Sequence, residues 1–322
     1  MRDIRAQAFE WERTMRSLFL SAILLLTGCQ PVQPPVNLAG NTWLGYQPLY
    51  LALAERDCAD CILELGDNQQ LQVTMLPSTT QVLRLLSTGQ LDAAMLTLDE
   101  ALTFQSETDI DICIASILSY SNGVDAVLTL PDFNPGNPFQ IGYEETALGG
   151  YMLRRSVELA GWSAGQFSAR SLVPRRHVQA LLEREVDVVI TYEPYVSQLL
   201  KAGAVVLLDS RQLPGEVIDV LVVRRQIWQQ RQQLFALLRE DIWPKGLARL
   251  QQPDTAALAL LSRNTQLSPE ELQQALAGMA FPTGEQDPKQ LAERLTPVID
   301  RMNQYLLHTA HIHKAANLGL CR

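Results

Sequence analysis

The sequence predicts an α/β protein of two similar lobes, each a mostly parallel sheet flanked by helices, followed by a helical C-terminal region. First, short apolar runs alternate with segments of helical period over residues 36–224, which is the pattern of βαβ units. Second, one helix–turn–strand segment recurs once further along the chain. Third, no strand pattern follows Gln226, and the residues beyond it have helical patterns.

The composition bounds the class of protein. Of the 322 residues, 47% are hydrophobic and 19% are charged, which excludes disordered, collagenous and coiled-coil chains. The length predicts about two domains. Acidic residues outnumber basic ones by 35 to 26, and the net charge of −9 argues against a protein that binds nucleic acid through phosphate contacts.

The N-terminal region indicates export. Residues Ser17–Leu26 form a mostly apolar run directly after Arg16, which is too short for a membrane span and typical of a signal peptide. The run ends in Leu26-Thr27-Gly28-Cys29, which resembles the bacterial lipoprotein box, in which the cysteine is acylated. The alternative is a chance cysteine after a buried helix.

We therefore expect a signal peptide over residues 1–28, a lipid anchor on Cys29 and a short, stiff, proline-containing tether over residues 29–35. Acidic residues are unusual in a leader, so that Met15 is an alternative start to Met1.

Apolar runs bounded by turn residues predict the strands. They cover residues 36–39, 71–76, 91–96, 112–118, 124–130, 139–142, 186–191, 205–208 and 217–223. Helical periodicity predicts helices between them, at residues 47–56, 79–88, 99–106, 146–160, 176–184 and 194–202. In the C-terminal region, a capping side chain precedes a proline at Ser268-Pro269 and at Asp287-Pro288, which is typical of helix starts.

The repeated segment indicates two lobes. Leu85–Met95 and Leu181–Ile190 each contain a helix end, a tight turn, an aspartate and a buried strand, and an acidic loop follows each strand. In open α/β sheets, ligands bind beyond the carboxyl ends of the strands. Two such ends that face each other would form a cleft; the alternative is that any two βα units look alike.

The other cysteines give separate signals. Cys58 and Cys61 form a C-x-x-C motif, for which we expect a local disulfide, with free thiols or a metal or redox site as alternatives. Cys113 lies in an apolar run and is interpreted as a small buried hydrophobic residue. Cys321 lies in the C-terminal tail and gives no indication.

Seven segments carry a family resemblance: Asn41–Ala52, Gly89–Ala94, Thr97–Ala101, Ser121–Ala126, Ile141–Ala147, Val186–Pro194 and Pro214–Val220. In this order, they resemble the periplasmic substrate-binding lipoproteins of ABC uptake systems, in the group that binds nitrate, sulfonates, taurine and thiamine pyrimidines. The chain departs from this family at Pro135–Gln140, where a Leu-Lys-Gly-Lys stretch commonly opens the second lobe.

The resemblance implies the type II periplasmic-binding-protein fold, in which two segments cross between lobes that close on a ligand. We place the crossings near residues 120–130 and 209–220. Lobe one then comprises residues 36–125 and 220–322, and lobe two comprises residues 126–219. The resemblance also implies that the protein lies on the periplasmic side of a bacterial membrane and has ABC permease and ATPase subunits as partners. A membrane sensor protein is the alternative partner, and we expect a monomer.

The loops at the strand ends and crossings supply the candidate ligand-binding residues. These are Trp43, Tyr46, Ser78, Thr79, Asp99, Ser121, Asn122, Asp125, Thr146, Glu193 and Glu216. Trp43 offers a flat face to a planar or cationic ligand, and Glu193 offers a carboxylate at a helix start. For each candidate, core packing, helix capping or hinge hydrogen bonding is the alternative role.

The charge of the cleft loops bears on the ligand. Six carboxylates lie in these loops, whose motifs contain no Lys or Arg: Asp99, Glu100, Glu144, Glu193, Glu216 and Asp219. Sulfonate or nitrate binding would instead require helix N-termini and basic groups. We therefore expect a small nitrogen-bearing organic molecule held by Trp43 and Glu193, with a sulfonate or nitrate as the alternative.

The sequence indicates no catalytic residue, cofactor or metal. It contains no dinucleotide, Walker or nucleophile-elbow motif, and the cleft motifs lack the reactive His or Cys that a pyrimidine-biosynthesis enzyme of the same fold would need. His177 is interpreted as a solvated surface residue. His308, His311 and His313 form a possible metal-binding tail, for which a frayed terminus is the favoured interpretation.

Overall fold

Two sheets organise the part of the chain that the structure describes. The structure is a computed structural model that describes residues 33–54, 62–65, 69–282 and 288–322, and residues 35–322 form one unit by their contacts. Cys29, Cys58 and Cys61 lie outside the described residues, so that the predicted lipid anchor and local disulfide stay predictions.

The first sheet has the strand order β12-β5-β11-β4-β1-β3-β2. Its strands are β1 (Val36–Gly40), β2 (Ile62–Glu64), β3 (Gln70–Met75), β4 (Ala93–Thr97), β5 (Ile112–Ser121), β11 (Ile218–Arg224) and β12 (Met279–Ala280). β1 pairs in parallel with β3 and β4, whereas β11 runs antiparallel to β4 and β5. Every residue of β4 is buried, which is why its sequence shows a continuous apolar run rather than alternation.

The second sheet has the order β10-β6-β9-β7-β8. Its strands are β6 (Asp125–Thr129), β7 (Phe139–Tyr143), β8 (Phe167–Ser171), β9 (Val188–Tyr192) and β10 (Val205–Asp209). β7 pairs in parallel with β8 and β9, and β6 runs antiparallel to β9 and β10. The predicted two-sheet α/β fold is confirmed. Each sheet is mixed, because β2 and β11 in the first sheet and β6 in the second run antiparallel to their neighbours.

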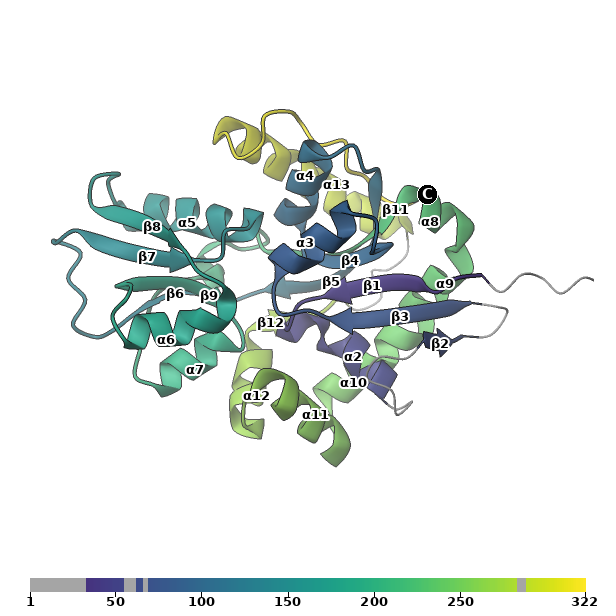
Figure 1. Cartoon of the computed structure of the whole chain (residues 1–322), viewed down its shortest axis with the longest axis horizontal. Helices are drawn as coiled ribbons and strands as arrows, with labels where there is room; N and C mark the ends of the chain where they lie inside the picture. Colours follow the sequence, from purple (N-terminus) through teal and green to yellow (C-terminus); the bar gives the residue numbers. More distant parts are fainter. Residues whose placement is uncertain (1–32, 55–61, 66–68, 283–287) are drawn as a thin grey trace, which may run out of the picture. The chain divides into compact units, whose positions relative to one another are not determined.

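Helices cover both faces of each sheet. Figure 1 shows α3 (Thr79–Ser87) and α4 (Leu98–Glu107) on one face of the first sheet, with α2 (Gln47–Ala54) and α10 (Trp243–Gln251) on the other. In the second sheet, α5 (Ala147–Ala160) covers one face, and α6 (His177–Leu182) and α7 (Tyr195–Lys201) cover the other. Among the described residues, no helix combines the length and apolar character of a membrane span.

The C-terminal region is mainly helical, as predicted. It contains α8 (Arg225–Gln230), α9 (Gln232–Leu237), a π-helical turn η4 (Leu238–Ile242), α11 (Thr255–Thr265), α12 (Pro269–Ala277) and α13 (Pro288–His308). The predicted start of α12 is confirmed: the Ser268 hydroxyl accepts from the Glu271 amide at 3.3 Å, and the Glu271 carboxylate accepts from the Ser268 amide at 2.7 Å.

The repeated segment corresponds to the same local structure in both sheets. Asp92, before β4, accepts a hydrogen bond from the backbone N–H of Asn37 in β1 at 2.9 Å. Asp187, before β9, accepts one from the N–H of Gln140 in β7 at 2.8 Å. Each aspartate therefore joins two adjacent parallel strands at their amino ends, which explains why the same residue recurs at the same place.

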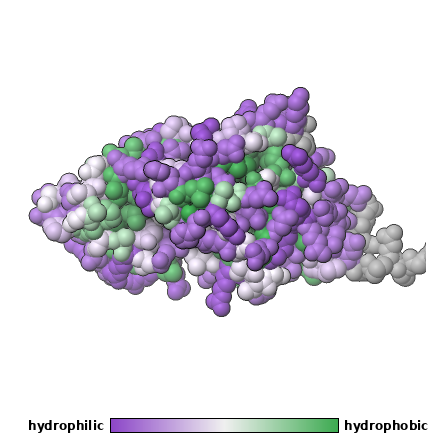
Figure 2. Space-filling model, turned by 90° about the horizontal axis from the view of Figure 1, so that it is seen from above, coloured by the Kyte–Doolittle hydropathy of each residue, from purple (hydrophilic) through white to green (hydrophobic). Residues whose placement is uncertain are grey.

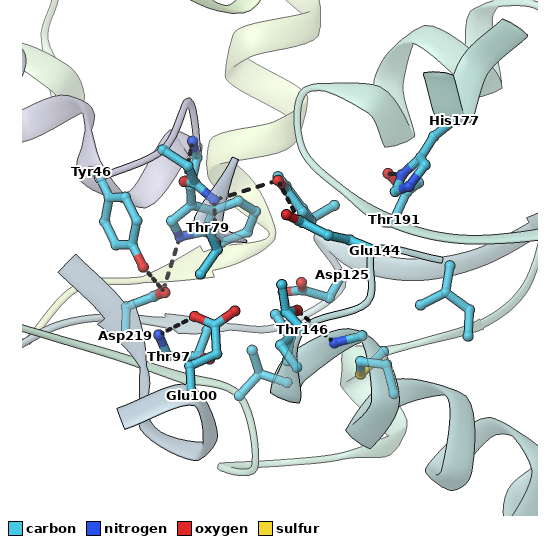
Figure 3. A pocket seen from close by; sticks show the side chains of 18 residues that line it. Tyr46, Thr79, Thr97, Glu100, Asp125, Glu144, Thr146, His177, Thr191 and Asp219 are labelled. Carbon is cyan, nitrogen blue, oxygen red and sulfur yellow. Dashed lines mark hydrogen bonds between the residues drawn. The ribbon is translucent and has the colours of Figure 1, made fainter. Parts of the chain in front are cut away.

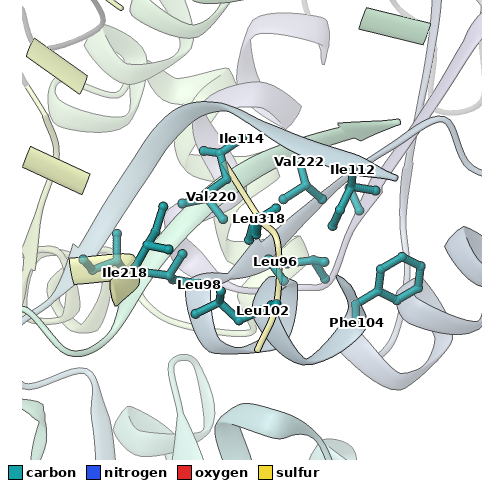
Figure 4. Close-up of a cluster of buried hydrophobic side chains, with 14 of the residues drawn as sticks. Leu96, Leu98, Leu102, Phe104, Ile112, Ile114, Ile218, Val220, Val222 and Leu318 are labelled. Atoms are coloured by element: carbon teal, nitrogen blue, oxygen red, sulfur yellow. The ribbon is translucent and has the colours of Figure 1, made fainter. Parts of the chain in front are cut away.

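A large hydrophobic cluster joins α4 to the first sheet and to the end of the chain (Figure 4). Leu98 and Leu102 of α4 pack with Val220 of β11, and Leu318 of the C-terminal tail belongs to the same cluster. Burial of side chains of this size stabilises the fold by about 1.5–3 kcal/mol each. The C-terminal tail is thus held in the core rather than frayed.

A disulfide also anchors the tail. Cys113 in β5 is bonded to Cys321 across a sequence separation of 208 residues, and Ile114 forms a β-bridge with Leu320. Cys113 is fully buried, as the sequence predicts, and the disulfide is a feature that the sequence did not indicate. The two cysteines lie far apart in the sequence, so that no local spacing reveals the pairing.

The sequence patterns missed β2, β8 and β12. The last four residues of β8 are exposed, because β8 is an edge strand, and its sequence therefore lacks an apolar run. β12 has two residues and pairs with the end of β5, which is too short a segment for a periodic signal.

The exposed large apolar side chains are spread along the described part of the chain, and only Val205 and Val206 are adjacent to each other. They are Ile62, Met75, Leu159, Val173, Leu182, Leu200, Val205, Val206 and Leu307. On the face that Figure 2 shows, hydrophobic residues form patches divided by hydrophilic ones. Scattered residues of this kind are ordinary on a protein surface, so that the concave regions carry more information about function.

Candidate functional site

A buried pocket lies where strand ends of the two sheets meet, and we call it the inner pocket (Figure 3). Its lining comprises Asn41, Trp43, Tyr46, Thr79, Thr97, Glu100, Asp125, Glu144, Thr146, Leu148, Gly149, Met152, His177, Ile190, Thr191, Tyr192, Val217 and Asp219. Thr97 and Tyr192 end parallel strands, and Asn41 and Glu144 directly follow two others. This is the position at which open α/β sheets bind ligands.

The lining contains carboxylates and no lysine or arginine. The acidic residues are Glu100, Asp125, Glu144 and Asp219. Burial is the largest cause of the raised pKa of each of these four groups, and neighbouring carboxylates raise the pKa of Glu100 and Asp125 further. Among the described residues, no group of three or more His, Cys, Asp or Glu side chains is placed to hold a metal ion.

Asp219 in β11 organises one wall of the pocket. Its carboxylate accepts hydrogen bonds from the Trp43 indole N–H at 2.9 Å, from the Tyr46 hydroxyl at 3.0 Å and from the Ser119 hydroxyl. Burial raises the pKa of Asp219 to about 6, although these three hydrogen bonds favour the charged form. The polar groups of Trp43 and Tyr46 are thus directed at Asp219, and the two rings supply apolar surface to the pocket.

Glu144 joins the two sheets. It follows β7, and its carboxylate accepts from the Thr80 hydroxyl at 3.0 Å and from the Thr80 backbone N–H at 3.4 Å, in the first turn of α3. The Tyr192 hydroxyl donates to it at 3.4 Å. A Cβ atom at Gly149 would lie 1.8 Å from the Glu144 carbonyl oxygen, so that glycine allows α5 to pack against this loop.

A carboxylate thus occupies the N-terminus of α3. Backbone N–H groups at a helix N-terminus attract anions, and here the anion is a side chain of the protein itself. Burial raises the pKa of Glu144, and the hydrogen bonds from Thr80 and Tyr192 oppose that shift.

His177 is buried, and its interpretation as a surface residue was wrong. Its Nε2 lies 3.2 Å from the Leu172 carbonyl oxygen, and its Nδ1 lies 2.8 Å from the Thr191 hydroxyl. A carbonyl only accepts, so Nε2 carries the proton. Burial lowers the pKa of His177 to about 4, and the neutral ring therefore accepts from Thr191 at Nδ1. The Thr191 oxygen is left with only acceptor capacity for other partners.

Asp125 opens β6 and is 3% exposed. Within the described part of the chain, its Oδ2 atom is buried and has no hydrogen-bond partner. Burial raises the pKa of Asp125 to about 8, the hydrogen bond from Ser121 opposes the shift, and the charges of Asp219, Asp99 and Glu193 add to it. A buried carboxylate oxygen without a partner is unfavourable unless a donor from outside the chain satisfies it.

Five of the predicted ligand-binding residues line the inner pocket: Trp43, Tyr46, Thr79, Asp125 and Thr146. Thr79 accepts from the Asn41 amide at 2.9 Å, and Thr146 caps α5 by accepting from the Gly149 N–H at 3.2 Å.

The other six predicted residues lie outside this lining. Ser78 caps α3, Asp99 is buried in the first turn of α4, and Ser121 lies 2.7 Å from the Ser210 hydroxyl at the crossing segments. Their roles in ligand binding stay predictions.

Asn122, Glu193 and Glu216 are engaged elsewhere. Asn122 is exposed and donates its backbone N–H to Gly278. The Glu193 carboxylate accepts from the Ser197 N–H and hydroxyl at 3.1 and 2.8 Å. Glu216 pairs with Arg155 at 2.9 Å and accepts from Tyr151.

Asn41, Thr191 and Tyr192 also line the inner pocket, although no sequence motif indicated a role for them. Asn41 donates to the Tyr192 hydroxyl at 3.4 Å, and the Trp43 and Tyr192 rings meet edge to face with their centroids 5.8 Å apart. The internal repeat could have indicated Thr191 and Tyr192, because they end β9 in the same way as Thr97 ends β4.

The chain has the fold of the periplasmic solute-binding proteins. Among solved structures, the aliphatic sulphonate-binding protein SsuA of Escherichia coli superposes with a TM-score of 0.68 at 14% sequence identity, covering 88% of this chain and 96% of that one. The alkanesulfonate-binding protein SsuA of Xanthomonas axonopodis pv. citri, bound to MOPS, gives 0.67 at 14% identity, covering 88% and 95%.

The ligand-binding component of an ABC-type import system from Staphylococcus aureus, with zinc bound, gives a TM-score of 0.68 at 12% identity, covering 88% of this chain and 94% of that one. No family model and no curated protein sequence matches this chain. The resemblance that the sequence motifs indicated is therefore confirmed in the structural neighbours, at the level of the fold.

Proposed function

We propose that this protein is a solute-binding protein that holds a small, nitrogen-bearing organic cation in the inner pocket and delivers it to an ABC importer. The fold and its structural neighbours support a binding role rather than an enzymatic one. The chemistry of the pocket supports the class of solute.

The observation that carries the proposal is the unpartnered Oδ2 of Asp125. The indole N–H of Trp43 and the hydroxyls of Tyr46 and Tyr192 are all directed at carboxylates of the chain. The Thr191 hydroxyl donates to His177. The Oδ2 of Asp125 therefore remains as an acceptor for a ligand, and the Thr97 hydroxyl, which also lacks a partner among the described residues, can accept as well as donate. A protonated amine or amidine supplies the matching donors together with a compensating charge.

The position of Glu144 argues against an anionic solute. A sulfonate would be attracted to the N-terminus of α3, where the Glu144 carboxylate already accepts from Thr80. It would also meet the carboxyl groups of Glu100, Asp125 and Asp219 without any lysine or arginine in the lining. Three of the structural neighbours are named for sulfonates, and we propose that this chain differs from them in its solute.

The proposal includes two lobes that close on the solute, with boundaries at residues 36–125 and 220–322 for one lobe and 126–219 for the other. It also includes a lipid anchor at Cys29, which would hold the protein on the periplasmic side of the membrane, close to its permease. A ligand that contacts both lobes stabilises the closed state by its differential affinity.

A thermal-shift and calorimetry screen tests the proposed solute class. We expect alkylamines and amidines to raise the melting temperature and alkanesulfonates to leave it unchanged. Asp125→Asn should weaken amine binding by about tenfold to a hundredfold, because a hydrogen bond to a charged group contributes about 1.5–3 kcal/mol.

Asp132→Asn is the matched control, because Asp132 forms an exposed ion pair with Arg184 and does not line the inner pocket. Stabilisation by sulfonates with none by amines would contradict the proposal.

A further inference from the structure

The inner pocket is too small to hold a whole organic solute of ordinary size. Its cavity of about 30 Å³ has room for about two water molecules, whereas ligand pockets usually measure about 300–1,000 Å³. The space fits a head group such as an ammonium or amidinium. The rest of any larger solute must lie elsewhere.

A second cavity begins where the inner pocket ends, and we call it the outer groove. Its volume is about 940 Å³, and Glu100 and Thr146 line both cavities. Figure 3 shows these two residues at the inner pocket, Glu100 from α4 and Thr146 from the loop that opens α5. The two cavities therefore adjoin at these residues, which is where a molecule with its head group in the inner pocket would extend towards the outer groove.

The walls of the outer groove differ in chemistry from those of the inner pocket. Leu83 and Phe104 come from the helices of the first sheet, and Leu153 and Phe167 come from the second sheet and its helix. Charged groups of both signs, Arg84, Glu107, Glu145 and Arg154, are exposed residues of the same lining. The groove thus offers apolar surface from both halves of the molecule and no excess of positive charge.

We propose that the outer groove is a second subsite, which holds an uncharged and largely apolar tail of the solute. The solute class is then an elongated amine or amidine with an aliphatic or aromatic tail, rather than a compact ammonium ion. This inference rests on the proposed function, because the tail is attached to the cationic head group that we propose for the inner pocket.

A series of linear primary amines from propylamine to octylamine tests the subsite by calorimetry on the whole protein. We expect the dissociation constant to fall about fourfold for each methylene that enters the groove, which is the fold-change for about 0.8 kcal/mol per buried CH₂. Leu153→Gln should reduce the gain for octylamine and leave propylamine binding unchanged. The matched control is Leu159→Gln, because Leu159 lies on the same helix, is 43% exposed and is not part of the groove lining.

The outcomes separate the two proposals. Equal affinity for all amines, or equal length dependence in the Leu153 and Leu159 variants, overturns the subsite and leaves the proposed head-group site intact. Failure of every amine to bind overturns the proposed function, and the subsite with it. Octanesulfonate could instead bind more tightly than propanesulfonate and lose this advantage in Leu153→Gln. That result would support the outer groove as a subsite and contradict a cationic head group.

Discussion

Replacing Asp219 by alanine is expected to lower the free energy of unfolding by about 3 kcal/mol or more at pH 7. The variant leaves the indole N–H of Trp43 and the hydroxyls of Tyr46 and Ser119 without their acceptor in a buried environment. Each unsatisfied buried polar group costs about 1–3 kcal/mol. Burial raises the pKa of Asp219 to about 6, so that its charge is itself unfavourable, and removing the charge offsets part of this loss.

The loss is measured by urea unfolding of the wild-type protein and the variant. Hydroxyls can rotate towards other acceptors, but the indole N–H of Trp43 cannot, so Asp219→Ala with Trp43→Phe should restore part of the stability. Asp132→Ala serves as the control for loss of an exposed carboxylate. An effect of Asp219→Ala no larger than that of Asp132→Ala would show that the hydrogen-bonded cluster does not stabilise the fold.

The sequence predicted the part of the site that depends on where strands end and where the chain crosses between the sheets. Trp43 and Thr146 could be placed near the pocket, because they follow the ends of parallel strands, which meet at one edge of a sheet. Asp125 could be placed there because it lies at the first crossing between the lobes. Glu193 and Glu216 lie equally close to strand ends, yet the structure pairs them with Ser197 and Arg155. The choice between neighbouring partners and a pocket depends on side-chain directions that no sequence period encodes.

Two other features were not predicted from the sequence. The signal was ambiguous for one, and the residues lie far apart in the sequence for the other. His177, Ala180 and Leu181 occupy one face of α6, and that spacing would have placed the histidine in the core. Its neighbours Arg175 and Arg176 made it resemble a surface residue instead. The pairing of Cys113 with Cys321 depends on the path of the tail back to β5, which only the assembled core determines.

The affinity for a cationic solute is expected to rise with pH, by up to about tenfold per pH unit between pH 6 and pH 8. Burial raises the pKa of Asp125 to about 8, so that the empty pocket holds a proton on this group below that pH. A cation beside Asp125 favours the ionised form, and the proton must leave when the cation binds. The raised pKa values of Glu100, Glu144, Asp99, Asp219 and Glu193 act in the same direction.

Calorimetry with an alkylamine in buffers of different ionisation enthalpy measures this proton release, because an alkylamine stays protonated below about pH 10. Asp125→Asn should flatten the pH dependence while leaving the protein folded. A neutral solute would show no such release, and an anion would bind more tightly as the pH falls. Either result would contradict a cationic ligand, whatever its size.

The stability of the empty protein should fall as the pH rises, whereas the affinity for the cation should increase. Asp125 has a pKa of about 8 in the folded protein, against its ordinary value of 3.8, so the folded state binds more protons than the unfolded state between these values. The free energy of unfolding therefore falls as the pH rises through this window. A saturating amine takes the place of the protons on these carboxylates. Melting temperatures recorded from pH 5 to pH 8 should therefore decline steeply without the amine and only slightly with it. Parallel declines would mean that the ligand does not lie beside these carboxylates.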